Sequence, residues 1–396
     1  MVALRKMRIA LLSAAFPPQF DGIGDHTWWL SQALAELHQE VTVLTSRAQN
    51  RPQPANVEVV SFFDVSRPKT ISQALRALRP TNRFDWLIVQ YNPFSFGHRG
   101  FAPWLVPGLA ATGIPIALMF HETFAVPMWP WQHVLMRLWQ YPQFIALVRT
   151  GRCHFVSTER WLAQVRQWAR SPSFLLPVGS NLPLCRLTKH EARKRLGIEP
   201  DALVLGVFGF AHMSKRAEWI GAAARLIHSR FPKTLVLSVG QIGSWVRGAS
   251  GDVPVHDHGS LPGSEVSLRL RAMDLFLAPL TDGISARRGS VVAAFQHGLP
   301  ICSTVRQHSD HFLRDFASPA FSLTPSNDQT LFMEAALMLS EKVLQQPDLG
   351  RDLLEFHDRH FAWPVIARRI LAGLSSAQPH GRSSPKGTEN PSSFSR

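Results

Sequence analysis

Acidic residues are scarce in this 396-residue chain, and cysteines are scarcer. Its 28 Asp and Glu stand against 42 Lys and Arg, a formal net charge of +14, which favours anionic partners such as phosphates, nucleic acids or acidic membrane surfaces. The three cysteines (Cys153, Cys185 and Cys302) are too widely spaced for a metal-ligand or redox motif. We therefore expect free thiols in a reducing cytoplasm.

Long hydrophobic runs are also missing. No apolar stretch reaches the ~18 to 20 residues that cross a bilayer. Residues 1–18 have a basic start and a short apolar stretch, as a signal peptide does, but residues 8–16 fit a first buried strand that runs into a proline-containing loop. With 45% hydrophobic and 18% charged residues, the chain can bury sizeable cores, and its length predicts two globular domains.

Several motifs of catalysis and ligand binding are absent. The chain has no GxxxxGK[ST] phosphate loop, no GxSxG nucleophile elbow and no DxD carboxylate pair. His256, Asp257 and His258 could begin a metal site, but no third ligand follows at a usual spacing, so no metal is expected. The basic residues are dispersed, which disfavours a nucleic-acid-binding protein, although that class remains an alternative.

Strand-like and helix-like segments alternate through the first part of the chain. Runs rich in Ile, Val and Leu are separated by segments whose apolar residues have helical spacing. The strand-like runs are residues 8–14, 40–46, 85–91, 114–120 and 153–158, and the helical segments are 28–37 and 72–78. This alternation predicts a parallel sheet with crossover helices.

The same alternation restarts after residues 171–190, a segment rich in Pro, Ser and Asn that we interpret as a linker. The second set of strand-like runs comprises residues 202–210, 234–240, 268–280 and 299–304, with helices at 219–231 and 291–298. The sequence thus predicts an α/β protein with two Rossmann-like, doubly wound domains that face a cleft. In such domains the ligand lies beyond the carboxyl ends of the strands.

The predicted boundaries follow from these segments. The N-terminal domain is expected at residues 1–175 and the second domain at 176–360. An amphipathic helix at residues 361–374 is expected to cross back to the N-terminal domain. Residues 375–396 contain seven serines in 22 positions and almost no apolar side chains, so we expect them to be disordered.

Two strand ends in the first domain carry candidate ligand-binding residues. Gly22 and Gly24 follow the first strand and precede a helix, where glycine lets a ligand approach closely and free N–H groups attract an anion; a tight turn is the alternative. His121 and Glu122 directly follow residues 114–120. A histidine beside a carboxylate at the carboxyl edge of a sheet is a candidate for substrate contact.

Two loops of the second domain combine cations with helix starts. Lys215 and Arg216 follow a strand and precede a helix, an unfavourable place for a cation unless an anion lies between them. Lys215 is therefore a candidate phosphate ligand. The second loop comprises Asp282, Gly283, Arg287, Arg288 and Gly289, and leads into a helix near Ser290. Two such loops at one sheet edge are expected to hold a diphosphate.

Taken in order, these pieces resemble the retaining glycosyltransferases of the GT-B fold, specifically the large family 4, over about residues 7–374. The matching pieces are the first-strand loop with PP and DGIG, the HE at residues 121–122, PVGSN at 177–181, Gly209 with Lys215, AMDLFLAPLTDGIS, and HGLPICST.

The resemblance implies a role for each piece. Gly22 and Gly24 would line the acceptor and diphosphate side of the cleft, His121 would lie near the transferred sugar, and Lys215 would hold the donor diphosphate. The implied donor is a nucleoside diphosphate sugar and the implied acceptor is a saccharide or a lipid-linked saccharide, without a metal or another cofactor. Synthesis of cell-surface polysaccharide or glycolipid would be the setting.

The chain departs from the family pattern where the family has a pair of glutamates. Asp282 stands where the family has the first of two glutamates, which contacts hydroxyls of the sugar, and Ser290 replaces the second, which contacts the ribose. A serine cannot offer a carboxylate to two hydroxyls, so a catalytically silent GT-B protein that acts as a binding partner is an alternative. The RRGS between them resembles a subgroup with arginines there, and we expect Arg287 or Arg288 to face the donor phosphates.

Aromatic residues are concentrated at residues 126–144, with Trp129, Trp131 and Trp139 among apolar neighbours. One interpretation is helix packing inside the first domain. The other is a patch that meets an anionic membrane, where Trp and basic side chains are favoured, so that a cytoplasmic protein would lie on the inner face of the cell membrane.

Overall fold

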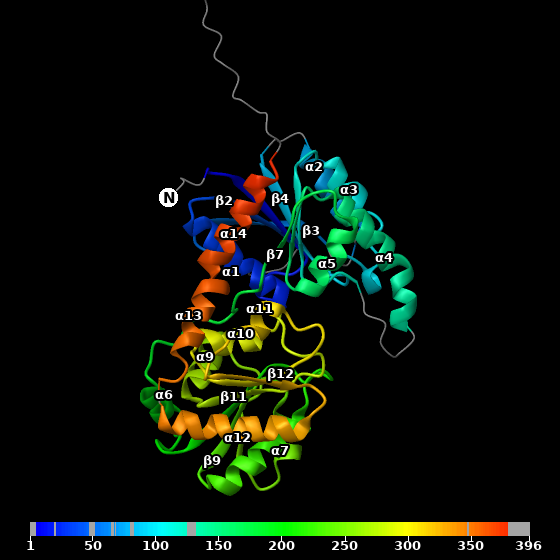
Figure 1. The fold of residues 1–396 in the computed structure, drawn as a ribbon. Helices are drawn as coiled ribbons and strands as arrows, with labels where there is room; N and C mark the ends of the chain where they lie inside the picture. Colours follow the sequence, from blue (N-terminus) through cyan, green and yellow to red (C-terminus); the bar gives the residue numbers. More distant parts are fainter. Residues whose placement is uncertain are drawn as a thin grey trace, which may run out of the picture.

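The computed structural model describes residues 5–19, 21–46, 52–64, 67, 69–79, 83–124, 132–346 and 348–378, with backbone only at 132–134. Two parallel sheets, each flanked by helices, form two lobes that follow one another along the chain (Figure 1). The predicted α/β architecture with two Rossmann-like domains is confirmed.

The N-terminal sheet contains seven parallel strands in the order β3-β2-β1-β4-β5-β6-β7. Its strands are β1 Arg8–Ser13, β2 Glu40–Ser46, β3 Val57–Phe63, β4 Trp86–Tyr91, β5 Ile116–Phe120, β6 Cys153–Val156 and β7 Ser173–Leu175. Its helices are α1 Gly22–Glu36, α2 Lys69–Ala77, the 3-10 helix η2 His98–Gly100, α3 Leu105–Ala111, α4 Gln132–Thr150 and α5 Glu159–Trp168. Neighbouring residues of β1, such as Leu11 and Leu12, belong to different buried clusters, so helices cover both faces of the sheet.

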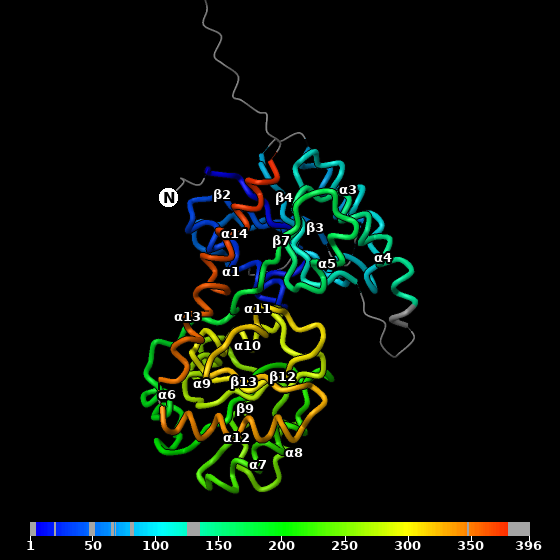
Figure 2. The backbone as a smooth tube through the Cα atoms, viewed as in Figure 1, coloured from blue at the N-terminus to red at the C-terminus, as the bar shows by residue number. Residues whose placement is uncertain are grey.

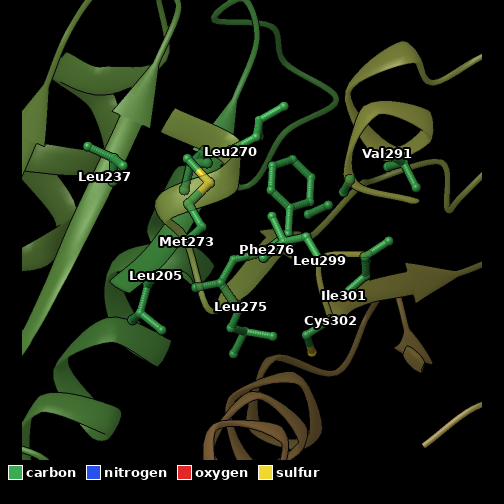
Figure 3. Packing of buried hydrophobic residues seen from close by; sticks show 14 of the residues in the cluster. Leu205, Leu237, Leu270, Met273, Leu275, Phe276, Val291, Leu299, Ile301 and Cys302 are labelled. Atoms are coloured by element: carbon green, nitrogen blue, oxygen red, sulfur yellow. The ribbon is translucent and has the colours of Figure 1, made fainter. Parts of the chain in front are cut away.

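The second sheet contains six parallel strands in the order β10-β9-β8-β11-β12-β13. Its strands are β8 Leu203–Phe208, β9 Thr234–Val239, β10 Val255–Asp257, β11 Leu275–Ala278, β12 Ile301–Val305 and β13 Phe321–Pro325. Its helices are α6 Lys189–Leu196, α7 Ala217–Arg230, α8 Gly243–Ser250, α9 Gly263–Ala272, α10 Gly289–Gln296, α11 His311–Arg314, α12 Gln329–Gln345 and α13 Arg351–His360. Figure 3 shows its core, where Phe276 and Ile301 of neighbouring strands pack near Val291 of α10.

Strand order reverses once in each sheet. The reversal lies between β1 and β4 in the first sheet and between β8 and β11 in the second. In both cases the first strand of the sheet pairs with a strand on each side, so the two loops that leave the reversal run to opposite faces. Such a switch point is where open α/β sheets bind ligands.

The last helix, α14 (Trp363–Ser376), returns to the N-terminal domain, as predicted. It follows α13 and packs along α1 (Figures 1 and 2). Ile366, Ile370 and Leu371 are fully buried in the N-terminal core, and burial of each such side chain contributes roughly 1.5–3 kcal/mol. The helix is therefore an integral part of a domain whose sheet ends almost 190 residues earlier in the chain.

The connection between the domains is held by two tryptophans. The indole N–H of Trp363 donates to the carbonyl of Ser180 (2.8 Å), and that of Trp29 donates to the carbonyl of Asn181 (3.1 Å). A Cβ at Gly179 would lie 2.6 Å from the Trp363 ring. The connection thus passes between α1 and α14 with its backbone bonded to both.

Parts of the sequence prediction were wrong. The segment 171–190 is not entirely a linker, because β7 lies within it; a three-residue edge strand is too short to show an alternating pattern. Residues 268–280 divide between α9 and β11, since an apolar run does not by itself distinguish a buried helix from a strand. The predicted strands also omitted β3, so His121 follows the fifth strand. Residues 379–396 of the predicted tail lie outside the described residues.

The cysteines and the lengths of the helices can also be compared with the sequence expectations. The three cysteines are free, with Cys153 and Cys302 buried and Cys185 half-buried. Across the described ranges, no helix combines the length and the apolar character that a membrane span requires.

Candidate functional site

The carboxyl ends of the two sheets meet through an ion pair. Glu122 follows β5 of the first sheet, and Arg287 lies in the loop after β11 of the second. A guanidinium nitrogen of Arg287 donates to a carboxylate oxygen of Glu122 at 3.0 Å. Residues predicted from two distant parts of the sequence are therefore brought to one place.

Lys215 lies in the loop between β8 and α7, at the switch point of the second sheet. Its ammonium donates to the carbonyl of Phe208 at 2.8 Å. Among the described residues no carboxylate forms an ion pair with it, and burial together with the nearby charge of Arg288 lowers the pKa of Lys215 to about 8. A Cβ at Gly209, where φ is +124°, would lie 2.3 Å from the Lys215 nitrogen. Glycine at 209 therefore leaves the space that this ammonium occupies.

Arg288 is the residue that precedes α10. Its guanidinium donates to both oxygens of Asp282, at 2.6 Å for Oδ2, and to the hydroxyl of Ser214 at 3.1 Å. Burial is the main cause that lowers the pKa of Arg288, and the adjacent charge of Arg287 adds to it. Because Ser214 directly precedes Lys215, the two predicted cationic loops are in contact here.

Arg287 has different partners. Besides its bond to Glu122, it lies 3.5 Å from a carboxylate oxygen of Asp282, and its guanidinium lies over the ring of Trp161 in α5, 5.0 Å from the centroid. A cation over an indole face is attracted by the ring quadrupole. Two of its three partners thus belong to the N-terminal domain, so the adjacent arginines point to different domains.

The start of α10 completes this edge of the second sheet. Ser290, in the first turn, and Lys215 line the same small pocket beside β8 and β11. Gly289 has no protein atom within 4 Å of the place where a Cβ would lie. Gly283 is different, because it has φ +77° and a Cβ there would lie 2.6 Å from the backbone nitrogen of Arg306. Packing therefore requires glycine at 283 and leaves the space beside 289 open.

The N-terminal edge carries neutral groups. His121 shares a hydrogen bond of 2.8 Å between its Nε2 and Oε1 of Gln90, a buried residue of β4. Burial lowers the pKa of His121 to about 4, so the ring is neutral near pH 7. With the Gln90 oxygen as acceptor, Nε2 carries the proton and Nδ1 keeps a lone pair.

His26 lies behind His121. The two rings meet edge to face with centroids 4.7 Å apart, and the ring of Trp363 lies 5.1 Å from His26 on α1. Within the described residues neither ring nitrogen of His26 has a hydrogen-bond partner. Burial, followed by the neighbouring His121, lowers the pKa of His26 well below its usual range. The two histidines therefore make this part of the edge polar without adding charge to it.

The start of α1 is capped by the protein itself. The carboxylate of Asp21 accepts hydrogen bonds from the backbone N–H of Ile23 and Gly24. A Cβ at Gly24 would lie 3.1 Å from the backbone of Phe16, whereas one at Gly22 would meet no protein atom within 4 Å. Packing thus explains Gly24, as in the tight-turn interpretation, and leaves the surface at Gly22 free.

Several residues of this region were not predicted from the sequence. They are Gln90, His26, Ser214, Trp161, Glu159 and Asp310. Gln90 could have been found, because it is a polar residue within an otherwise apolar strand, and Asp310 follows the end of β12 at the same edge as the predicted loops. Trp161 and Glu159 gave no such signal, because they belong to an ordinary amphipathic helix.

In the part of the chain that the structure describes, no group of three or more His, Cys, Asp or Glu side chains is arranged to hold a metal ion. His256, Asp257 and His258 lie on or next to β10, where Asp257 accepts a hydrogen bond from the backbone of Gly259.

Comparisons with known proteins identify the fold. No protein-family model matches the chain, and no curated protein matches its sequence. Sucrose-phosphate synthase from Thermosynechococcus elongatus matches with a TM-score of 0.71 and 17% identity, over 94% of this chain and 100% of that one. HepE from Anabaena in complex with UDP and glucose matches with 0.66 and 13%, over 93% and 100%. A putative UDP-N-acetylglucosamine 2-epimerase from Listeria monocytogenes matches with 0.59 and 12%, over 94% and 96%. This chain therefore has the GT-B fold.

Proposed function

We propose that this protein is a retaining glycosyltransferase that moves a sugar from a nucleoside diphosphate sugar to a saccharide or lipid-linked acceptor, in the synthesis of cell-surface polysaccharide or glycolipid. The GT-B fold supports this proposal without deciding it, because matching structures include a glycosyltransferase-like synthase and a putative epimerase. The case therefore depends on the chemistry of the strand ends.

One observation carries the proposal: the ammonium of Lys215, which has no carboxylate partner within the described ranges. A buried cation without a carboxylate partner is costly unless another anion offsets it. Lys215 lies beside Arg288 at the switch point of the second sheet and next to the first turn of α10, where the positive end of the helix dipole favours a negative charge. Together these groups suit a diphosphate.

The proposed chemistry follows from this charge. When the bond between the anomeric carbon and the diphosphate oxygen breaks, its electron pair stays on that oxygen. The acceptor hydroxyl forms the new bond to the carbon and passes its proton to the departing phosphate oxygen. Lys215 and Arg288 would stabilise the growing negative charge more strongly in the transition state than in the ground state. No metal is needed in this proposal, since the cations of Lys215 and Arg288 would supply the positive charge at the leaving group.

The N-terminal edge suits the other reactant. A sugar presents hydroxyl groups, which both donate and accept hydrogen bonds, and His121 offers an accepting Nδ1 held in place by Gln90. Glu122 and Asp282 add carboxylate oxygens that could accept from hydroxyls. Because the histidines are neutral, they would not attract the diphosphate away from Lys215.

The direct test is turnover. Purified protein is screened with UDP, GDP and ADP sugars by thermal shift, where a ligand at about 100 times its Kd adds about 2.7 kcal/mol of stability. Sugars that stabilise are then supplied with radiolabel in the sugar and with membrane extract as acceptor. We expect label in a new glycoside. Stabilisation without turnover would favour the catalytically silent alternative, and conversion of the free nucleotide sugar to its epimer would overturn the transferase.

We also propose that the N-terminal domain contacts anionic membrane from the cytoplasmic side. Residues 123–158 contain no Asp or Glu but three arginines. Leu138 on α4 is 72% exposed, and Leu135 and Phe101 are also exposed. Trp139 itself donates its indole N–H to the carbonyl of Arg99, so it braces α4 against the loop before α3. Trp129 and Trp131 lie outside the described residues.

Vesicle sedimentation tests the membrane contact. We expect binding to vesicles of phosphatidylserine and phosphatidylcholine, and weaker binding after Leu138→Glu, because the substitution removes apolar surface and repels the lipid charge. Met338→Glu is the matched control, since Met338 is also an exposed apolar residue (59%) and lies on α12 of the other domain. Equal binding by both variants would remove α4 from the proposed contact.

A further inference from the structure

Asp310 joins the two domains through backbone hydrogen bonds. It is fully buried, with 0% of its surface exposed, and precedes α11 in the second domain. One carboxylate oxygen accepts from the N–H of Glu159 in the N-terminal domain at 2.7 Å, and the other accepts from the N–H of Ala286 at 2.7 Å. Its side chain makes no capping bond to its own helix. The carboxylate thus connects two elements that are distant in sequence.

The bond to Glu159 is reciprocated. The backbone N–H of His311 donates to the carboxylate of Glu159 at 3.0 Å, and the His311 ring also contacts that carboxylate. Glu159 is the first residue of α5, whose N–H has no partner inside its own helix. Each helix therefore supplies a carboxylate at or next to its start to the backbone of the other.

Ala286 lies within the donor loop, which we define as residues 279–288. Its N–H is bonded to Asp310, and its carbonyl accepts from Val178 of the interdomain connection at 3.3 Å. The next two residues are the arginines, Arg287 bonded to Glu122 and Arg288 bonded to Asp282. The backbone position from which both guanidiniums extend is thus fixed by groups outside the loop.

We propose that Asp310 is a positioning residue that sets the geometry of the donor loop according to whether the N-terminal domain is docked. This inference rests on the proposed function for its catalytic meaning, because the loop matters to catalysis only if it holds a donor. Its structural content, that α5 of one domain orders a loop of the other through one carboxylate, does not depend on the function.

A carboxylate suits this position because it accepts at two oxygens and donates at neither. Charge-assisted bonds to N–H groups are stronger than neutral ones. When one of the two bonds is lost, the carboxylate is held by a single hydrogen bond, and its bond to the other N–H is less firmly fixed. Burial raises the pKa of Asp310, while the bonds from Ala286 and Glu159 act in the opposite direction. By linkage, any ligand that favours the ordered loop must favour docking by the same factor.

The backbone N–H of Glu159 can be removed without a substitution in the donor loop or at Asp310. Glu159→Pro deletes it, and proline is favoured at the first position of a helix. Thr158 before it has φ −138° and ψ 152°, a conformation that a residue preceding proline adopts readily. Glu159→Ala keeps the N–H but loses the carboxylate, so the difference between the two variants isolates the bond to Asp310.

Two further variants complete the set. Asp310→Asn keeps the shape but offers one accepting oxygen in place of two. Asp328→Asn is the matched control, because the Asp328 carboxylate also accepts a backbone N–H, that of Leu331 at the start of α12, and this bond lies within the second domain.

Hydrogen exchange measured by mass spectrometry reads the donor loop directly. We expect peptides covering residues 279–288 to exchange about tenfold faster in Glu159→Pro than in Glu159→Ala, and faster in Asp310→Asn than in Asp328→Asn, at equal melting temperatures. Equal exchange in Glu159→Pro and Glu159→Ala would overturn the inference. If Glu159→Pro fails to fold, Asp310→Asn against Asp328→Asn decides the question in the same way.

Turnover then separates this inference from the proposed function. We expect Glu159→Pro to lower kcat about tenfold with little change in the Kd for UDP or GDP. Docking of the N-terminal domain would order the donor loop only when both domains form the complete site. If the loop exchange changes as expected but the wild-type protein transfers no sugar, the positioning role stands and the transferase proposal fails. If the enzyme is active and Glu159→Pro leaves kcat unchanged although its donor loop exchanges faster, the proposed effect of Asp310 on catalysis is refuted.

Discussion

The two sheet edges that face each other share a topology but differ in chemistry. Both are the switch points of parallel sheets in which the order of strands reverses beside the first strand. The N-terminal edge has the buried residues His26 and Gln90 and the half-buried His121, and both histidine rings are neutral. The second edge has Lys215 and Arg288, which keep positive charge despite burial. The same arrangement of strands therefore presents one surface suited to hydroxyl groups and another suited to phosphates.

This difference lies in the loops and not in the sheets. In both domains the strands supply apolar residues to the core, and the distinguishing side chains follow the last residue of a strand or lie at its end. Glu122 and Arg287 connect the two edges, because they bring an acidic group of the first edge and a basic group of the second into contact. The contrast predicts that variants on the second edge will affect binding and departure of the diphosphate, whereas variants on the N-terminal edge will affect contacts with sugar hydroxyls.

Removal of the Lys215 ammonium should have the largest effect. We expect Lys215→Ala to lower kcat about 100- to 1000-fold, or about 3 kcal/mol, because a fixed cation then no longer stabilises the departing diphosphate. The fold should persist, since a buried charge is lost without breaking a salt bridge. Lys233→Ala, at an exposed lysine paired with Asp201 in the same domain, is the control. Wild-type turnover by Lys215→Ala, measured with the stabilising nucleotide sugar, would refute the role.

Substitution of the two arginines should give the next largest effect, and the effect should differ between them. Arg288→Ala is expected to weaken binding of the nucleoside diphosphate about 10- to 100-fold by calorimetric titration, since its guanidinium lies beside Lys215 and carries a charge-assisted bond. Arg287→Ala should change this affinity several-fold at most, because its partners are Glu122 and Trp161 of the other domain. Equal affinity in both variants and the wild type would remove the arginines from the diphosphate site.

The sequence predicted the second edge better than the first, for physical reasons. Cations next to helix starts, as at Lys215 and Arg288, conflict with the local electrostatics, and such a conflict is visible in the sequence alone. His26 packs against the ring of His121, 95 positions away, and Asp310 accepts from residues 24 and 151 positions away, so no local pattern indicates their roles. The short strands β7 and β10 were missed because three residues carry no periodicity. The doubly wound order followed from the alternation of long segments.

A change of pH should give the smallest effect and confine it to one edge. The pKa of Lys215 is lowered to about 8, mainly by burial, and a bound diphosphate would raise it again because an adjacent negative charge favours the ammonium. Between those two pKa values binding takes up a proton, so affinity for the nucleoside diphosphate should fall severalfold as pH rises from about 7.5 to 9, by at most about tenfold per pH unit. His121, with a pKa of about 4, stays neutral over this range and cannot cause the change.

Calorimetry at pH 8 in two buffers of different ionisation enthalpy should show proton uptake in the wild type and none in Lys215→Met. Proton uptake that persists in Lys215→Met would assign the titration to another group and weaken the charge contrast between the two edges.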